Sequence, residues 1–241
     1  MFLQNKKIVI IGGSSGIGFA IAETALEAGA KVIIASRSKE KLAEAKARLN
    51  HQVETFSVDT RDLSQLKAFF AQIGSFDHLQ ITASEISFGE FSSLPMEDAK
   101  AMFESKFWGP YQAAQAALPY LSPQGSITFY SGAYSQLPKT PGASVAAAIN
   151  SAVEGLGRAL AVELAPIRVN TITPGIVDTE LFTTLGFDAS QRQTLFEAVT
   201  QSQVIKRPAM PKEISQTALY LMSNTYSTGN TLFVDGGLTF R

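Results

Sequence analysis

The sequence contains no cysteine and only two histidines, His51 and His78, among its 241 residues. Without cysteine the chain can form no disulfide bond, thiolate nucleophile or cysteine-ligated metal site, which is compatible with a reducing compartment. The two histidines lie near predicted strands and far from each other in the sequence. Because metal sites gather several ligands, we expect no bound metal ion.

Charge is scarce and nearly balanced, with 20 lysines and arginines against 21 acidic residues and a net charge of -1. Since there is no basic run, the sequence lacks the electrostatic signature of a nucleic-acid-binding protein. No stretch approaches the length of a membrane span, and the N-terminal apolar run is too short for a signal peptide. We therefore expect a cytoplasmic protein that binds neither nucleic acid nor membrane.

The sequence does contain a regular alternation of short apolar runs and helix-length amphipathic segments. The runs predict strands at residues 7–12, 31–36, 53–58, 77–83, 125–131, 167–173 and 230–235. The predicted helices cover residues 17–28, 39–49, 63–73, 96–118, 144–164, 188–204 and 212–222. Such alternation requires crossover connections, so it predicts an α/β fold with one doubly wound parallel sheet covered on both faces. The length fits a single domain over residues 1–241.

One region, residues 179–211, breaks this alternation between the sixth and seventh predicted strands. Doubly wound sheets bind ligands beyond the carboxyl ends of their strands, where such an insertion would lie. The region is therefore either a mobile lid over a substrate or a pair of surface helices that covers the sheet edge. Both possibilities stay open.

A glycine-rich turn follows the first predicted strand. It consists of Gly12, Gly13, Ser14, Ser15, Gly16, Ile17 and Gly18. Glycines allow a tight turn, and the N-terminus of the following helix directs free N–H groups at an anion. This strand-turn-helix context predicts that the turn binds the pyrophosphate of a dinucleotide.

The end of the second predicted strand indicates which dinucleotide. Proteins that bind NAD commonly place a carboxylate there for the ribose 2′-hydroxyl, whereas this chain has Ser36, Arg37 and Ser38. A charge-assisted contact from arginine to a 2′-phosphate is worth about ten- to a hundredfold in affinity. We therefore favour NADP(H) over NAD(H), the alternative being that Arg37 simply points into water.

Together these features resemble the short-chain dehydrogenase/reductase family, nearly from end to end. The glycine turn matches the family motif Thr-Gly-x-x-x-Gly-x-Gly with only the threonine replaced, by Ile11. The stretches AVEGLGRALAVELAPIRVNTITPGIVDTEL and GNTLFVDGG follow its pattern as well. The resemblance implies a Rossmann-type fold with seven parallel strands in the order 3-2-1-4-5-6-7. It also implies a homo-oligomer, a dimer or tetramer, with the last strand near a neighbouring subunit.

The resemblance further implies cofactor contacts outside the glycine turn. They include the pair that holds adenine, the end of the fourth strand, one position on the long helix and the segment that holds the nicotinamide carboxamide. In this sequence the implied contacts are Asp59, Thr60, Ala83, Ser84, Asn150, Pro174, Gly175, Ile176 and Thr179.

None of the four catalytic positions of the family carries its usual residue in this sequence. Alignment of the motifs puts Lys106 at the asparagine, Gly132 at the serine, Ala146 at the tyrosine and Asn150 at the lysine. In the family the tyrosine gives a proton to the developing alkoxide, and the adjacent ammonium lowers its pKa. Ala146 has no proton to give and Asn150 has no charge, a loss of about 10² to 10⁴ in rate.

Four residues are candidates for the missing proton donor. Lys106 could face the pocket from the preceding helix with a pKa lowered by burial, and Tyr134 could reach it from a loop. Tyr130 and Ser131 lie at the end of the fifth strand and point to opposite faces of the sheet, so at most one of them faces the site. The alternative for each is a solvated lysine or a packed side chain.

Two functions therefore stay open. The protein is either an NADP(H)-dependent oxidoreductase for a small-molecule carbonyl or alcohol, with a non-standard proton relay, or a nucleotide-binding sensor, scaffold or partner subunit without turnover. The cofactor motifs fit both. The loss of four catalytic residue types favours the second, and membership of an enzyme family favours the first.

Overall fold

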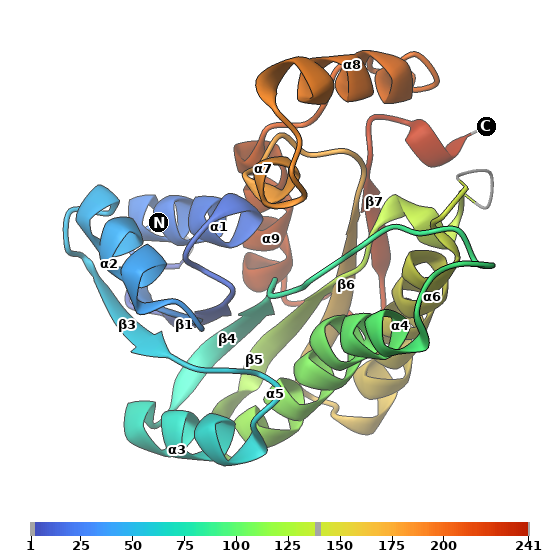
Figure 1. The fold of residues 1–241 in the computed structure, drawn as a ribbon. Coiled ribbons are helices and arrows are strands. Elements are labelled where there is room, and N and C mark those ends of the chain that lie inside the picture. Colours follow the sequence, from blue (N-terminus) through green and yellow to red (C-terminus); the bar gives the residue numbers. More distant parts are fainter. Residues whose placement is uncertain (1–2, 138–140, 241) are drawn as a thin grey trace.

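A parallel sheet of seven strands forms the centre of the computed structural model, which describes residues 3–137 and 141–240 (Figure 1). The strands are β1 Lys7–Ile11, β2 Lys31–Ser36, β3 Val53–Ser57, β4 Phe76–Ile81, β5 Leu121–Tyr130, β6 Arg168–Pro174 and β7 Thr231–Val234. Their order is β3-β2-β1-β4-β5-β6-β7, with parallel pairing throughout. The predicted fold class and strand order are therefore confirmed.

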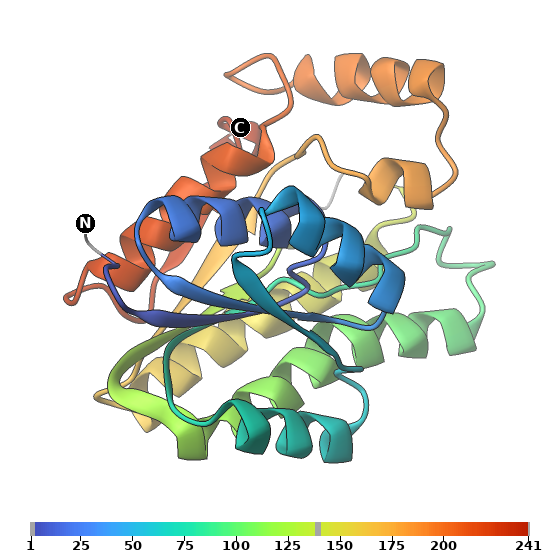
Figure 2. The same ribbon diagram turned by 90° about the vertical axis from the view of Figure 1, so that its left-hand side faces the viewer.

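Helices cover both faces of the sheet (Figures 1 and 2). One face carries α1 Gly16–Glu27, α2 Lys39–Arg48 and α9 Pro211–Ser223, and the other carries α3 Leu63–Ile73, α5 Gly109–Ala117 and α6 Ser144–Glu163. Alternate residues of β1 enter the two cores: Ile8 and Ile10 pack on the first, Val9 and Ile11 on the second. A strand buried on both faces needs a continuous apolar run, and IVII at residues 8–11 is one.

The long helix predicted at residues 96–118 is interrupted. It consists of α4 Met96–Phe103, a π-helical turn Glu104–Trp108 and α5, and the backbone N–H of Gly109 donates to the carbonyl of Glu104. The next residue, Pro110, has no N–H to donate to the carbonyl four residues earlier. In an ordinary α-helix its ring would also clash with that carbonyl. Sequence periodicity does not register such a widened turn, although π turns frequently mark functional sites.

The region that breaks the strand and helix alternation contains two helices, α7 Leu181–Thr184 and α8 Ala189–Thr200. Figure 1 shows both, in orange, above the carboxyl end of the sheet, with α7 near the start of α1 and α8 farther out. The first of these helices was missed in the sequence because it is only one turn long.

The expectation that no stretch approaches the length of a membrane span is wrong for α6. With 20 residues, this helix is long and apolar enough to cross a membrane by length and composition alone. The core helix of a soluble protein passes the same test. In this fold Ala146, Ile149 and Val153 of α6 are buried in the core against the sheet, which accounts for its composition.

Polar side chains link β4 to β5 inside the core. His78 Nδ1 lies 2.9 Å from Ser126 Oγ, Gln80 Nε2 donates to Thr128 Oγ1 at 3.1 Å, and Tyr130 Oη donates to Gln80 Oε1 at 2.8 Å. Buried polar groups of this kind are stable only when they are paired. Because each contact joins residues of the two strands, the set favours a single register between them.

The buried histidine makes stability depend on pH. Burial lowers the pKa of His78 from 6.5 to about 4, so below pH 6.5 the unfolded chain takes up a proton that the folded chain does not. We expect the free energy of unfolding to fall as the pH drops from about 6.5 to about 4, by at most about 3 kcal/mol. Urea unfolding across this range measures the loss.

A matched pair of variants isolates this effect. His78→Asn should flatten the pH dependence, whereas His51→Asn, at an exposed histidine, should keep the wild-type slope. The carboxyls of Asp62 and Glu213, whose pKa values are lowered from 3.8 and 4.5 to about 2, lose their contribution as the pH falls below about 4.5, equally in wild type and in both variants. Equal slopes for wild type and His78→Asn would contradict the prediction.

Candidate functional site

The glycine turn after β1 lies directly against the end of β4. A Cβ atom at Gly12 would be 2.5 Å from the backbone nitrogen of Ala83, and one at Gly18 would be 2.2 Å from the carbonyl oxygen of Gly12. Thr82 fits between the two, because its Oγ1 would be 2.6 Å from either Cβ. Gly16 has a φ of +53°, a backbone conformation that favours glycine. The turn therefore needs glycine at all three positions.

A cleft of about 560 Å³ opens beside this turn. Most of the cofactor-binding residues predicted from the sequence line it: Gly12, Ser14, Ser15, Gly16, Ile17, Gly18, Ser36, Arg37, Ser38, Asp59, Thr60, Ala83, Ser84 and Thr179. The other predicted residues, Asn150, Pro174, Gly175 and Ile176, lie outside its lining. Pro174 ends β6, and Gly175 donates its N–H to Val234 of β7 at 3.1 Å.

Further residues of the cleft were not among those predicted to bind the cofactor. They are Ile11, Lys41, Val58, Arg61, Thr82, Glu85, Ser105, Glu180, Leu181 and Thr184. Three of them carry charge and directly follow a selected residue in the chain: Arg61, Glu85 and Glu180. That adjacency was the available signal, because a loop that brings one residue to a ligand commonly exposes its neighbour to the same cleft.

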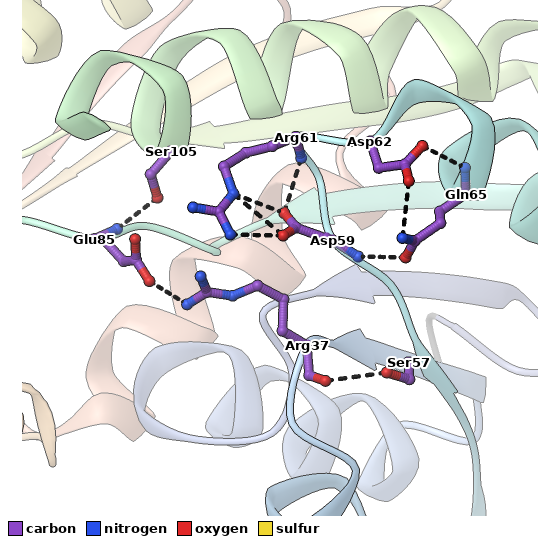
Figure 3. Close-up of polar contacts among 8 residues, drawn as sticks. All are labelled: Arg37, Ser57, Asp59, Arg61, Asp62, Gln65, Glu85 and Ser105. Carbon is purple, nitrogen blue, oxygen red and sulfur yellow. Dashed lines mark hydrogen bonds and ion pairs between the residues drawn. The ribbon is translucent and has the colours of Figure 1, made fainter. Parts of the chain in front are cut away.

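Two ion pairs occupy the end of the cleft near β2 and β3 (Figure 3). Arg37, after β2, pairs with Glu85, after β4. Arg61 Nη2 donates to Asp59 Oδ2 at 2.6 Å, and this hydrogen bond lowers the pKa of the Asp59 carboxyl. The carboxylate expected to lie near adenine is thus already engaged by a neighbouring guanidinium.

A third cation and an unpaired hydroxyl lie at the same end of the cleft. Lys41, on α2, adds a positive charge to those of Arg37 and Arg61. Ser36 Oγ is buried without a hydrogen-bond partner among the described residues. Because buried hydroxyls are normally paired, this atom is suited to a polar group of a ligand in the cleft.

The cradle at the start of α1 also has a carboxylate over it. Glu180, which precedes α7, accepts a hydrogen bond at its Oε2 from the backbone N–H of Gly16, at 3.1 Å. The neighbouring Thr179 lies over the same glycine, with its Cγ2 3.4 Å from where a Cβ would be. Residues 179–180 thus cover the N-terminus of α1, where an anion binds favourably.

At two of the family's catalytic positions, the side chain of Asn150 occupies the space beside Gly132. Asn150 is 1% exposed, and its Nδ2 donates to the carbonyl oxygen of Gly132 at 3.1 Å. A Cβ atom at Gly132 would lie 2.9 Å from the same nitrogen. Asn150 Oδ1 is buried and has no partner among the described residues. The amide therefore occupies room that a serine at 132 would need.

Lys106 extends from the π-helical turn toward the same segment. It is 6% exposed, and its Nζ donates to the carbonyl oxygen of Ser131 at 3.3 Å. Burial lowers the pKa of Lys106 from 10.5 to about 8, because the charged form loses its hydration. The side chain lies outside the lining of the cleft, which ends at its neighbour Ser105.

The three hydroxyl-bearing candidates differ in orientation. Tyr130 and Ser131 face opposite sides of the sheet, and Tyr130 bonds to Gln80 in the α1 and α9 core. Tyr134 packs edge-on against Phe88, and burial raises its pKa, which makes it a weaker acid near neutral pH. The hydroxyl of Ser131 points to α6.

The partner of Ser131 on α6 is Glu154, which was not selected from the sequence. This carboxylate is 4% exposed, and its Oε1 accepts from Ser131 Oγ at 2.8 Å, Ser135 Oγ at 2.6 Å and Thr173 Oγ1 at 3.3 Å. The signal was its spacing: positions 146, 150 and 154 share one face of a helix. Glu154 ties the loop after β5 to α6 and holds the Ser131 hydroxyl toward that helix.

Comparisons with known proteins agree with this architecture. A sequence model of the family described as "Enoyl-(Acyl carrier protein) reductase" matches residues 12–239. The short-chain dehydrogenase/reductase ATR9 of Stachybotrys chlorohalonatus is 32% identical over 98% of this chain and 97% of its own length. The chain therefore belongs to the short-chain dehydrogenase/reductase family, whose members are oxidoreductases that bind a nicotinamide cofactor.

Solved structures are similar over the whole chain. A crystal structure of a small-chain dehydrogenase in complex with NADPH is 31% identical, with a TM-score of 0.85 over 99% of this chain and 100% of that one. The reductase/Diels-Alderase MalC of Malbranchea aurantiaca is 28% identical, with a TM-score of 0.91 over 100% and 98%. The residues of the cleft fit a dinucleotide, since the glycine turn leaves no room for side chains and Ser36 Oγ has no partner in the part of the chain that the structure describes.

The contact between positions 132 and 150 predicts a strong coupling. Gly132→Ala should destabilise the protein by about 1–3 kcal/mol, because its Cβ would crowd the buried Asn150 amide. In the Asn150→Ala background the same change should cost little, so the two substitutions should couple by about 1 kcal/mol or more. Urea unfolding of the four proteins measures this, and additive costs would contradict the proposed contact.

Proposed function

We propose that this protein is an NADP(H)-binding oxidoreductase that interconverts a carbonyl and an alcohol of a small molecule with Lys106 as proton donor. The observation that carries the proposal is the buried ammonium of Lys106, with a pKa of about 8, beside the segment of the family's serine position. General acid-base catalysis works best with a pKa near the working pH. The family's phenol is absent from position 146.

The residues of the chain then have distinct tasks. The cofactor, when bound, supplies or accepts a hydride. The ammonium of Lys106 gives a proton to the carbonyl oxygen as it becomes an alkoxide, and takes it back in the direction of oxidation. Asn150 holds the loop after β5 through the carbonyl of Gly132. Its unpaired Oδ1 supports a hydrogen bond from a ribose hydroxyl of the cofactor.

The preference for NADP(H) is supported by the charges at one end of the cleft. Arg37, Lys41 and Arg61 all line it, and no carboxylate stands at the end of β2. A guanidinium can bind a 2′-phosphate through two parallel hydrogen bonds, whereas the 2′-hydroxyl of NAD(H) offers no charge. The NADPH complex of a relative 31% identical to this chain supports the same cofactor.

Removal of Arg37 tests the cofactor preference. Arg37→Ala should weaken NADPH binding by about ten- to a hundredfold and NADH binding much less, because only NADPH loses a charge-assisted contact. Calorimetric titration with both nucleotides measures the difference. Lys39→Ala removes an exposed cation two residues away, outside the cleft lining, and should leave the ratio unchanged. Equal losses for NADPH and NADH in Arg37→Ala would refute the preference.

The pH dependence of turnover tests Lys106. Carbonyl reduction needs the protonated ammonium, so the rate should be highest below pH 8 and should fall as the pH rises above it. Lys106→Met should lower kcat by about 10² to 10⁴ and remove this limb of the profile, while NADPH still binds. Lys100→Met, at an exposed lysine of α4, should keep the wild-type profile. An unchanged profile in Lys106→Met would exclude Lys106 as the donor.

A second function is favoured by the closure of the catalytic positions. Lys106 and Asn150 are buried outside the cleft lining, and Gly132 and Ala146 carry no proton donor. These features support a nucleotide-binding sensor, scaffold or partner subunit without turnover. NADPH oxidation with a panel of aldehydes and ketones separates the two. Tight NADPH binding without turnover of any of them would favour the second function.

We also propose the wider setting of this activity. Residues 1–241 form one domain in which residues 179–211 act as a lid over the substrate, supported by the position of α7 beside the cleft. The exposed Phe233 and Phe240 around β7 support a homo-oligomer, a dimer or tetramer. The absence of cysteine supports a cytoplasmic location. Neither nucleic acid nor membrane is proposed as a partner.

A further inference from the structure

Two carboxylates of the chain lie where the proposed cofactor would bring its phosphates. Glu85 pairs with Arg37, the residue suited to the 2′-phosphate, and Glu180 accepts from Gly16 N–H, in the cradle suited to the pyrophosphate. Both glutamates line the same cleft. They come from different parts of the chain, the loop after β4 and the residue before α7.

The Arg37–Glu85 pair reaches across the cleft. Arg37 follows β2 and Glu85 follows β4, and β1 with its glycine turn lies between these strands in the sheet. Figure 3 shows the two side chains extended toward each other, end to end. The backbone N–H of Glu85 donates to Ser105 Oγ at 2.8 Å, which fixes the backbone on its side of the bridge. A 2′-phosphate that binds Arg37 therefore competes with Glu85 for the same guanidinium.

Glu180 likewise occupies a group that a phosphate would bind, here the backbone N–H of Gly16 at the start of α1. Its Oε2 is a formally charged acceptor 3.1 Å from the Gly16 nitrogen, at the positive end of α1. A pyrophosphate oxygen needs the same N–H group, and the negative charge of a carboxylate bonded to that group would repel it. Glu180 is exposed and stands directly before α7, so its side chain can leave this N–H group for solvent.

We propose that Glu85 and Glu180 are internal competitors that set the affinity and the selectivity of the cleft for NADP(H). Glu180 competes with the pyrophosphate, which NADP(H) and NAD(H) share, and so lowers the affinity for both. Glu85 competes with the 2′-phosphate for Arg37, and so lowers the selectivity for NADP(H). The inference rests on the proposed cofactor, and it assigns to each glutamate a different measurable effect.

Calorimetric titration of three variants with NADPH and NADH tests the assignment. Glu180→Gln should tighten both nucleotides by about fivefold and leave their ratio unchanged, as expected for relief of one exposed charge contact. Glu85→Gln should raise the ratio of NADPH to NADH affinity by about fivefold. Glu44→Gln, at an exposed glutamate of α2 outside the cleft lining, should change neither. All three side chains are exposed, so the variants should fold.

Small probes separate the two anion positions without the rest of the dinucleotide. Inorganic pyrophosphate should bind more tightly to Glu180→Gln than to wild type and equally to Glu85→Gln. Adenosine 2′-monophosphate should show the opposite pattern, because it carries only the phosphate that faces Arg37.

The outcomes distinguish this inference from the proposed function. Normal binding of NADPH by wild type, with affinities and ratios unchanged in Glu85→Gln and Glu180→Gln, would overturn the competition and leave the cofactor standing. Tightening of NADPH in a glutamine variant of a wild type that binds it weakly would support the competition. Failure of all four proteins to bind either dinucleotide would overturn both.

Discussion

The close contact between the glycine turn and the end of β4 is the constraint on which the site depends. Thr82 lies where side chains at Gly12 and Gly18 would have to go, so the turn can approach β4 only because both residues lack a Cβ. This approach sets where α1 begins and directs its N-terminus at the cleft. The ends of β2 and β4 lie on either side of the turn, which brings Arg37 and Glu85 within reach of each other.

At the other end of the site, the positions of the family's catalytic residues carry groups that pack into the protein interior. Ala146 lies in the core with Ile149 and Val153, and the Asn150 amide fills the room beside Gly132. The π-helical turn then carries a lysine to the carbonyl of Ser131. A buried ammonium is costly, since desolvation opposes its charge. The same cost lowers the pKa of Lys106 to about 8, closer to neutral pH than that of an exposed lysine.

The α/β fold could be predicted from the sequence because the apolar runs, the helical periodicity and the glycine turn all indicate the same architecture. Strand β1 reads as a continuous apolar run, and the glycine turn follows it directly, so the strand, the turn and α1 could be predicted from local residues. The contacts of Glu154 and of the Arg37–Glu85 pair could not, since each depends on which segments meet in the folded chain. Only the helical spacing of Glu154 and the position of Glu85 directly after Ser84 were visible in the sequence. The interruption at Lys106 was missed because the apolar period continues through a π turn. The neighbours of selected residues, such as Glu180, were visible in the sequence but carried no motif.

The charges that line the cleft have a kinetic consequence. Arg37, Lys41 and Arg61 face Asp59, Glu85 and Glu180, so the formal charges of these cleft residues sum to zero. A neutral cleft exerts little long-range attraction on an anionic dinucleotide, unlike a site lined by unpaired cations, which speeds encounter by electrostatic steering. The association rate of a nucleotide should therefore vary little with ionic strength.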